Sequence, residues 1–209
     1  MRRLALVLAL APAALAAQAP VVTEQVSGTT ALLQAVAAVN EQVAWVSGHK
    51  GTVLRTRDGG TTWELKAVPG AETMEFRDIH AFSAEEAWLL AAGPGTKSRI
   101  YHTTDGGAKW ALQFTNADTA AFFDCFTFFD AKHGVAFSDA ANGRTMLMRT
   151  EDGGTSWNLL PSTALPAPLP GEGAFAASGG CLVSQGKSNA WVATGAPEGR
   201  LLVTTNGGK

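Results

Sequence analysis

The chain has 209 residues, with 16 basic and 18 acidic side chains, a formal net charge of −2, and only 16% of its residues charged. This composition excludes a charged disordered chain, and without a run of basic residues nucleic acid is not an expected partner. Hydrophobic residues make up 46% of the chain and there are 23 glycines, a combination typical of a turn-rich protein with a packed core.

Residues 1–19 are predicted to be a secretory signal peptide. Arg2 and Arg3 provide a positively charged start, residues 4–10 are apolar, and small residues suited to cleavage follow. An apolar core helix is the alternative. No later apolar run approaches the roughly 20 residues of a membrane span. The mature chain is therefore expected to be exported to the periplasm or the extracellular space, without spanning a membrane.

A motif of the form Thr-x-Asp-Gly-Gly-x-x-Trp recurs at a spacing of 47 residues, and a fourth copy with Asn at the Asp position begins near the end. Aspartate accepts hydrogen bonds from turn amides, and Gly-Gly provides the positive φ angles of a tight reversal, so each copy predicts a hairpin. Identical copies at a fixed period indicate a structural role rather than catalysis or metal binding. The residues assigned to this role are Asp58, Gly60, Trp63, Asp105, Gly107, Trp110, Asp152, Gly154, Trp157 and Asn206.

Each repeat contains four predicted strands. Residues 76–82 and 123–129 are the first strands of two repeats, and in every repeat the last two strands lie on either side of the hairpin turn. Four strands in a unit of this length are typical of a propeller blade. The predicted fold is therefore all-β, a β-propeller of four-stranded antiparallel blades. The predicted partial propeller covers residues 20–209, with blades at about 30–66, 75–113, 121–160 and 178–209, the last one incomplete.

The motif resembles the Asp-box, or BNR (bacterial neuraminidase), repeat. Together with the Phe-Arg-Asp segment at 76–78 and the glycine-rich segment at 171–179, it is most similar to bacterial proteins described as photosystem II assembly and stability factor-like. This resemblance implies a propeller of seven blades, of which the chain holds about four and ends inside the fourth Asp box. It also implies a non-catalytic module for protein binding or assembly.

No catalytic residue, metal ligand or cofactor is predicted within the chain. A sialidase uses a tyrosine nucleophile with a paired carboxylate and three arginines, whereas Tyr101 is the only tyrosine and takes a strand position that Leu54 and Met148 occupy in other repeats. Tyr101 is therefore expected to pack in the core. The alternatives are a sialidase-like glycoside hydrolase or a carbohydrate-binding propeller with its site in further blades, and a structural spacer in an envelope assembly.

Loops that join one blade to the next are expected on the face opposite the hairpin turns, and the longest of them, residues 160–180, is rich in proline. A protein or peptide partner is predicted to bind this loop face. The predicted contact residues are Arg77, Asp124, Asp139, Arg144, Glu172 and Ser178. Solvated loop charges and ion pairs between blades are the alternative for these residues.

The two cysteines, Cys125 and Cys181, occupy equivalent positions in successive innermost strands. Neighbouring innermost strands are expected to diverge from the propeller axis, beyond the roughly 7 Å over which a disulfide can form. The interpretation therefore favours two buried free thiols, with a disulfide between blades as the alternative.

Overall fold

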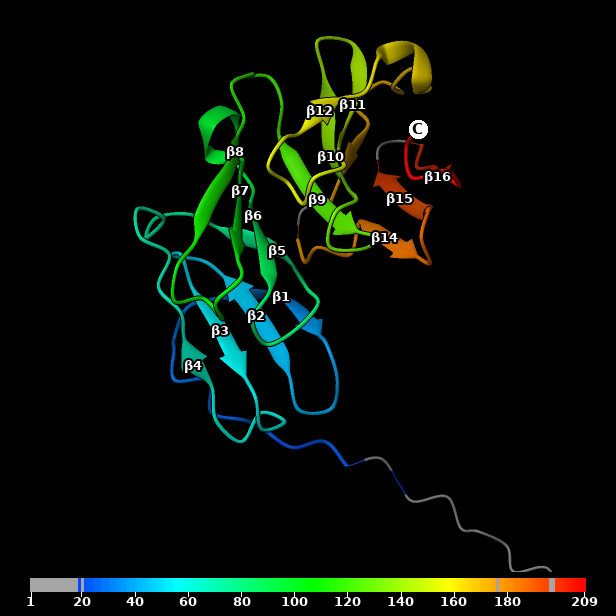
Figure 1. The fold of residues 1–209 in the computed structure, drawn as a ribbon. Helices are drawn as coiled ribbons and strands as arrows, with labels where there is room; N and C mark the ends of the chain where they lie inside the picture. The colour runs from blue at the N-terminus through cyan, green and yellow to red at the C-terminus, as the bar shows by residue number, and fades with distance from the viewer. Residues whose placement is uncertain (1–18, 20, 176, 196–197) are drawn as a thin grey trace, which may run out of the picture.

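The computed structural model describes residues 19, 21–175, 177–195 and 198–209. The predicted signal peptide lies outside this range except for its last residue, Ala19. The described chain forms four antiparallel four-stranded sheets arranged as propeller blades along an arc (Figure 1), with two short 3-10 helices, Gly95–Lys97 and Ser162–Ala164. The predicted fold class is confirmed. None of the helices in this described part is long and apolar enough to cross a membrane.

Strands in the first three blades follow one another in chain order across each sheet. Blade 1 contains β1 (Leu33–Ala38), β2 (Ala44–Gly48), β3 (Val53–Thr56) and β4 (Glu64–Leu65). Blade 2 contains β5 (Phe76–Ala81), β6 (Ala87–Ala91), β7 (Arg99–Thr103) and β8 (Ala111–Thr115). Blade 3 contains β9 (Phe123–Phe128), β10 (Gly134–Ala141), β11 (Arg144–Thr150) and β12 (Asn158–Leu159).

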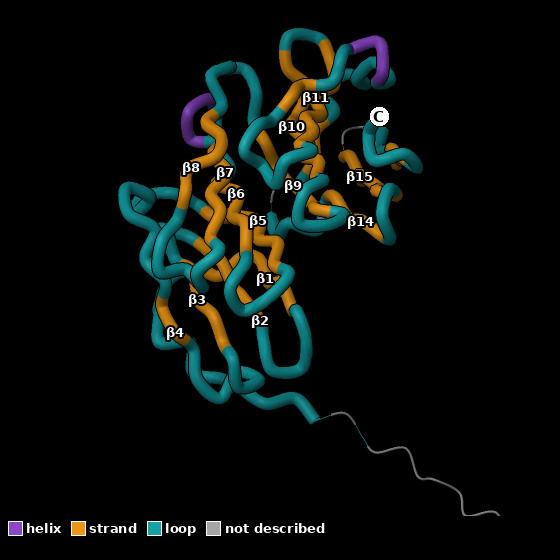
Figure 2. Tube along the Cα trace, in the orientation of Figure 1, coloured by secondary structure: helices purple, strands orange, loops and turns teal. Residues whose placement is uncertain are grey.

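The fourth blade has a different arrangement, because its central strand is β15 (Asn189–Gly195). β14 (Leu182–Gln185) and the two-residue β13 (Gly173–Ala174) both pair with β15, and β16 (Leu201–Thr204) also pairs with it. The long connection before β14 therefore supplies an extra short strand to the blade. Figure 2 shows the 3-10 helix of this connection, Ser162–Ala164, in purple near β11.

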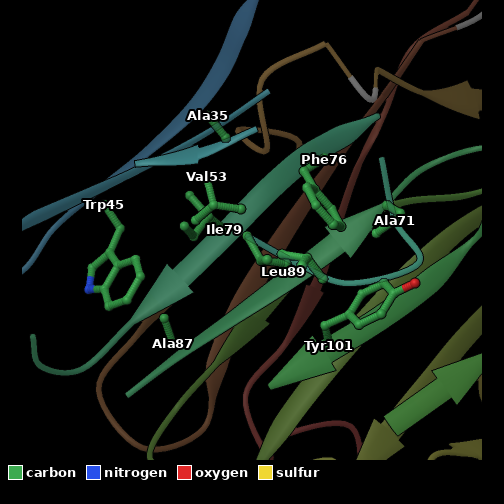
Figure 3. Packing of buried hydrophobic residues seen from close by; sticks show 11 residues of the cluster. Ala35, Trp45, Val53, Ala71, Phe76, Ile79, Ala87, Leu89 and Tyr101 are labelled. Carbon is green, nitrogen blue, oxygen red and sulfur yellow. The ribbon is translucent and has the colours of Figure 1, made fainter. Parts of the chain in front are cut away.

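The blades are held together by apolar side chains that fill the space between successive sheets. Every residue of β6 and of β9 is buried, because each of these strands belongs to a sheet that is covered on both faces. Figure 3 shows the cluster between blades 1 and 2, where Trp45 and Val53 meet Ile79, Leu89 and Tyr101. Tyr101 is 4% exposed, so its predicted place in the core is confirmed.

The three Asp-Gly-Gly turns and the Asn-Gly-Gly turn that begins at Asn206 contain equivalent hydrogen bonds. In blade 1, Gly60 N donates to Thr56 Oγ1 at 2.8 Å and Thr62 N donates to Asp58 Oδ1 at 2.9 Å. Gly59 and Gly60 have φ angles of 69° and 88°, which explains why two glycines are needed. Hydrogen bonds from Thr62 and Thr56 hold the pKa of Asp58 below its ordinary value. The corresponding bonds from Gly107, Gly154 and Gly208 to the threonine hydroxyls are 2.7–2.9 Å long.

Two further backbone bonds define the two faces of the propeller. Gly59 N donates to Gln42 O at 3.0 Å, so the Asp-Gly-Gly turn lies beside the turn between the first two strands. At the other end of the blade, Gly51 N donates to Met74 O at 2.9 Å, which joins the turn after β2 to the connection between blades. The connections between blades therefore lie on the face opposite the Asp-Gly-Gly turns.

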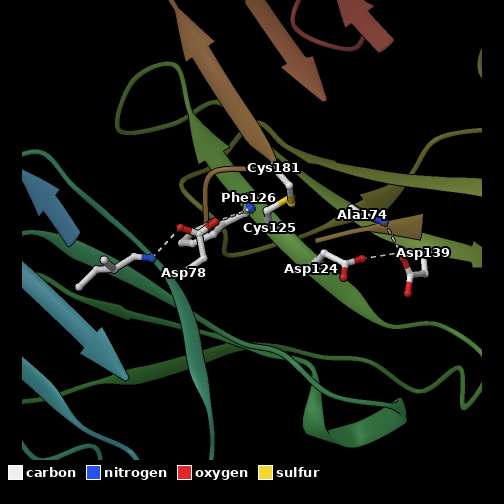
Figure 4. The surroundings of a disulfide bond; sticks show 8 residues. Asp78, Asp124, Cys125, Phe126, Asp139, Ala174 and Cys181 are labelled. Carbon is white, nitrogen blue, oxygen red and sulfur yellow. Dashed lines mark hydrogen bonds between the residues drawn. A yellow bond between two sulfur atoms is a disulfide. The ribbon is translucent and has the colours of Figure 1, made fainter. Parts of the chain in front are cut away.

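A disulfide between Cys125 and Cys181 joins the innermost parts of blades 3 and 4 (Figure 4), so the expectation of two free thiols is wrong. The two Cα atoms are 6.1 Å apart, within the range that a disulfide spans. The innermost strands approach each other here instead of diverging. Cys125 lies beside a register shift between β9 and β10, which changes the path of the strand at this point.

We predict that Thr150→Val lowers the free energy of unfolding by about 1–3 kcal/mol, because valine keeps the shape of threonine but leaves the buried Gly154 N–H without its acceptor. Thr155→Val is the matched control, since the Thr155 hydroxyl lies exposed in the same turn. The measurement is urea denaturation of both variants. Equal losses of stability would contradict the assigned role of the Thr150 hydroxyl.

We predict that the denatured, unreduced protein takes up no alkylating reagent, and that two adducts appear by mass spectrometry only after reduction. The double variant Cys125→Ala, Cys181→Ala should lower the free energy of unfolding by about 2–4 kcal/mol, because the disulfide closes a loop with a sequence separation of 56. Alkylation of both thiols without reductant would show that they are free.

Candidate functional site

The predicted contact residues lie at the loop-face ends of blades 2 and 3 and in the long connection between blades 3 and 4. Arg77 lies in β5, Asp124 in β9, Asp139 in β10 and Arg144 at the start of β11. Glu172 directly precedes β13, and Ser178 follows it in the connection to β14.

A repeated irregularity in the innermost strands determines where two of these side chains sit. The pairing registers of β1 with β2, β5 with β6 and β9 with β10 each shift by one residue, and the residues passed over are Gln34, Arg77 and Asp124. Such a bulge changes the direction of a side chain relative to the sheet. Arg77 and Asp124 therefore occupy equivalent positions in blades 2 and 3.

Asp124 and Asp139 form a carboxyl pair at this end of blade 3 (Figure 4). Asp139 N donates to Asp124 Oδ2 at 2.9 Å, and Ala174 N of β13 donates to Asp139 Oδ1 at 2.8 Å. Burial and the neighbouring charge of Asp139 raise the pKa of Asp124 to about 8, although the charge of Arg77 opposes the shift. Burial also raises the pKa of Asp139. The pair therefore holds a proton at neutral pH.

A second buried carboxyl, Asp78, lies between blades 2 and 3. Its oxygens accept hydrogen bonds from Phe126 N of β9 at 2.9 Å and from its neighbour Ile79 N at 2.8 Å. Burial raises the pKa of Asp78 to about 8. A Cβ on Gly179 would collide with the Asp78 carboxyl, which places the long connection directly over this group.

Sequence reasoning did not single out Asp78, although a signal was available. Asp78 precedes Cys125 by one repeat of 47 residues, so it takes the position at which the next two blades carry the disulfide cysteines. A charged residue there, between Phe76 and Ile79 in a buried strand, is an exception that calls for a partner. The carboxyl and the disulfide thus join successive blades from equivalent positions.

Glu172 holds the long connection in place through a two-point ion pair with Arg200. Arg200 Nε and Nη2 donate to the two Glu172 carboxylate oxygens at 2.7 Å each, and Thr194 Oγ1 donates at 2.7 Å. Burial acts to raise the pKa of Glu172, but the bonds from Arg200 and Thr194 hold it below its ordinary value. At 8% exposure, Glu172 fixes the loop rather than facing solvent. Nothing in the sequence pattern pairs it with Arg200.

The structure thus brings together some predicted residues and leaves others apart. Asp124 and Asp139 are in contact, and the positive charge of Arg77 acts to lower the pKa of Asp124. Arg77 is also bound to Glu75 at 2.5 Å and lies over the ring of Phe122 at 6.0 Å. Arg144 and Ser178 are exposed to solvent instead. Phe175, which sequence reasoning missed, is 73% exposed in the same connection as Ser178.

A cavity of about 510 Å³ lies between blades 3 and 4, away from these residues. It is lined mainly by apolar side chains, including Val135, Leu147, Leu160 and Leu202, and by none of the six predicted contact residues. No group of three His, Cys, Asp or Glu side chains in the described ranges is arranged to hold a metal ion. The charged cluster on the loop face is therefore the candidate site.

We predict that the free energy of unfolding falls as the pH rises from about 4 to about 8, because folded Asp78 keeps its proton in this window while the unfolded residue, with an ordinary pKa of 3.8, loses it. Asp78→Asn should remove this residue's share of the slope, about 1.4 kcal/mol per pH unit. The contribution of Asp124 to the pH dependence of stability remains in this variant. The measurement is urea denaturation at a series of pH values.

Asp78→Ala serves as the control, since it removes the acceptor of Phe126 N and should lower stability at every pH. If the wild type and Asp78→Asn show the same pH slope, the raised pKa of Asp78 is wrong.

Comparison with known proteins shows a family resemblance over part of the chain and a shared fold. Residues 16–117 match the family model described as photosynthesis system II assembly factor YCF48. No curated protein sequence matches the chain significantly. Among solved structures, "YCF48 bound to D1 peptide" is similar with a TM-score of 0.52 and 20% identity, over 81% of this chain and 51% of that chain. The chain thus spans about half the length of that structure.

Two GH74 enzyme structures share the architecture. The GH74 enzyme of Niastella koreensis matches with a TM-score of 0.58 and 15% identity, over 82% of this chain and 28% of that chain. An ancestral GH74 enzyme matches with a TM-score of 0.58 and 14% identity, over 84% of this chain and 23% of that chain. At these identities the structural likeness shows the fold alone. The family resemblance indicated by the repeats is confirmed over residues 16–117, and the chain is a β-propeller that is similar to photosystem II assembly factors of the YCF48 type.

Proposed function

We propose that the protein is an exported, non-catalytic module that binds a peptide segment of a partner protein and thereby supports the assembly or stability of a complex. The observation that carries this proposal is the family match over residues 16–117, together with the similarity to a YCF48 structure that contains a D1 peptide. Export rests on the predicted signal peptide, residues 1–19.

The loop face is the surface that we assign to the peptide. Arg144 is exposed there, next to the turn formed by Asn142 and Gly143, and Phe175 and Ser178 are exposed in the long connection. Arginine and aromatic side chains dominate the binding energy of protein interfaces. The ion pair of Glu172 with Arg200 fixes the connection, which lowers the entropy lost when a partner binds.

A glycoside hydrolase or carbohydrate-binding propeller is the second candidate, favoured by the likeness to GH74 enzymes and by the carboxyl pair Asp124 and Asp139. A general acid needs a raised pKa, which Asp124 has. It must also reach a substrate, and Asp124 is 2% exposed and held by a backbone amide. We therefore place peptide binding first. Release of reducing ends from a panel of polysaccharides, abolished by Asp124→Asn, would favour the hydrolase instead.

We predict that Arg144→Ala weakens binding of a D1 peptide about tenfold, because arginine at an interface donates several hydrogen bonds from one side chain. Lys109→Ala is the matched control, since Lys109 is also exposed but lies in the Asp-Gly-Gly turn of blade 2 on the opposite face. The measurement is fluorescence anisotropy with a labelled D1 peptide.

The control should change the affinity less than twofold. Binding that survives Arg144→Ala but is lost in Lys109→Ala would place the peptide on the turn face. Absence of binding by the wild-type protein would contradict a D1 peptide as the ligand class.

A further inference from the structure

The chain contains two Asn-Gly sequences, Asn142–Gly143 and Asn206–Gly207, and both asparagine side chains are exposed. Such a pair can react without an enzyme, because the backbone nitrogen of a residue that has no Cβ can approach and attack the asparagine side-chain amide. In a folded protein the reaction requires that the attacking nitrogen and the amide are free of hydrogen bonds. The two pairs differ in this respect.

Asn206 is held by hydrogen bonds at each of the groups that would react. Gly207 N donates to Ser188 O at 2.8 Å. Asn206 Oδ1 accepts from Thr204 Oγ1 at 2.8 Å, and Asn206 Nδ2 donates to Lys209 O at 2.6 Å. Because these bonds occupy both the attacking nitrogen and the leaving amide, the turn must open before Asn206 can react.

Asn142 lies at the tip of the hairpin between β10 and β11, where the backbone is less constrained. Ala141 pairs with Arg144, but a register shift between Ser138 and Ala141 separates this last pair from the rest of the ladder. In the described part of the chain, Gly143 N makes no hydrogen bond, and a Cβ on Gly143 would meet no atom within 4 Å. Asn142 also has a φ angle of 53°, in the left-handed region that few residues other than glycine adopt. The tip can therefore open without disturbing the blade.

One side-chain contact joins this tip to the connection between blades 2 and 3. Asn142 Nδ2 donates to Asp118 Oδ2 at 3.0 Å. Asp118 is itself fixed, because its Oδ1 accepts from Ala120 N at 2.9 Å and the buried Asn116 side chain donates to Asp118 O at 2.9 Å. The contact exists only while residue 142 carries an amide. A carboxylate at this position would face the carboxylate of Asp118 instead.

We propose that Asn142 is a site of spontaneous deamidation, which places a negative charge on the loop face beside Arg144. Gly143 N attacks Asn142 Cγ, its proton passes to the leaving Nδ2, and ammonia departs as a cyclic imide forms. Water then opens the imide at either carbonyl, which gives aspartate or isoaspartate. Each modified chain thus loses one ammonia and gains one carboxylate, and no oxidant or reductant takes part.

The new carboxylate changes the surroundings of a residue that we assign to the peptide, and this consequence rests on the proposed function. In the described ranges the exposed Arg144 side chain has no ion pair or hydrogen bond, so its guanidinium is open to a peptide. A carboxylate at residue 142 is repelled by Asp118 and attracted by Arg144. A peptide must then break the new ion pair before it binds Arg144. Deamidation therefore weakens peptide binding as the protein ages.

The first test is ageing of the full-length protein in mildly alkaline buffer, followed by trypsin digestion and mass spectrometry. Trypsin releases the two Asn-Gly pairs in separate peptides, residues 133–144 and residues 201–209, and each peptide contains one asparagine. Asn142 should convert to the acid at least about tenfold faster than Asn206, because the turn around Asn206 must open first. Equal conversion at the two sites, or faster conversion at Asn206, would overturn the proposal.

The same measurement in guanidinium chloride is the control for effects of the flanking sequence. Neither turn exists in the denatured chain, so Asn142 and Asn206 should react at similar rates. If Asn142 keeps its full advantage in the denatured chain, the hairpin tip is not the cause of its reactivity and the structural basis of the proposal is wrong.

The consequence for binding is tested with two variants of the same residue. Asn142→Asp should weaken binding of the labelled D1 peptide about twofold to fivefold, which is the strength of the exposed ion pair that the peptide must break. Asn142→Gly is the matched control, since glycine tolerates the φ angle of 53° and loses the same bond to Asp118 without adding a charge.

Equal affinities of these two variants would overturn the link between deamidation and binding. If the wild-type protein binds no D1 peptide, the proposed function fails, whereas the deamidation of Asn142 is still decided by the mass spectrometry of the aged protein.

Discussion

Packing of each blade against the next is the constraint on which the rest of this structure depends. A four-stranded sheet of this size cannot be stable alone, because both of its faces carry apolar side chains. The clusters between successive blades bury those faces, and the outer strand of one blade covers the turn glycine of the following blade. Near the axis the same junctions carry a buried carboxyl, Asp78, and the disulfide of Cys125 with Cys181.

These junctions support the proposal that the loop face is a binding surface. The turn face is occupied by hydrogen-bond networks that close the hairpins, so its aspartates are committed to structure. On the loop face, the buried Asp124 and Glu172 and the half-buried Asp139 hold the connections in fixed positions. Exposed groups such as Arg144 and Phe175 are thereby presented from a rigid base, which favours recognition of an extended peptide.

Much of the fold could be predicted from the sequence, because its period and turn chemistry are local. The Asp-Gly-Gly turns need particular residues at particular φ angles, and the four strands follow from their spacing. The disulfide could not be predicted, since the distance between neighbouring innermost strands depends on a register shift that no local pattern encodes. The ion pair of Glu172 with Arg200 could not be predicted, because the two residues are 28 positions apart and Glu172 lies in an irregular connection. Asp78 could have been found by comparing equivalent positions of the repeats.

The most direct test of the central claim, a peptide-binding loop face on a BNR propeller, is photo-crosslinking of a D1 peptide to the full-length protein, followed by mapping of the linked residues. The account predicts adducts at the connection that contains Phe175 and Ser178 and at the hairpin that begins β11 with Arg144. Adducts confined to the Asp-Gly-Gly turns, such as the one that contains Lys109, would contradict it.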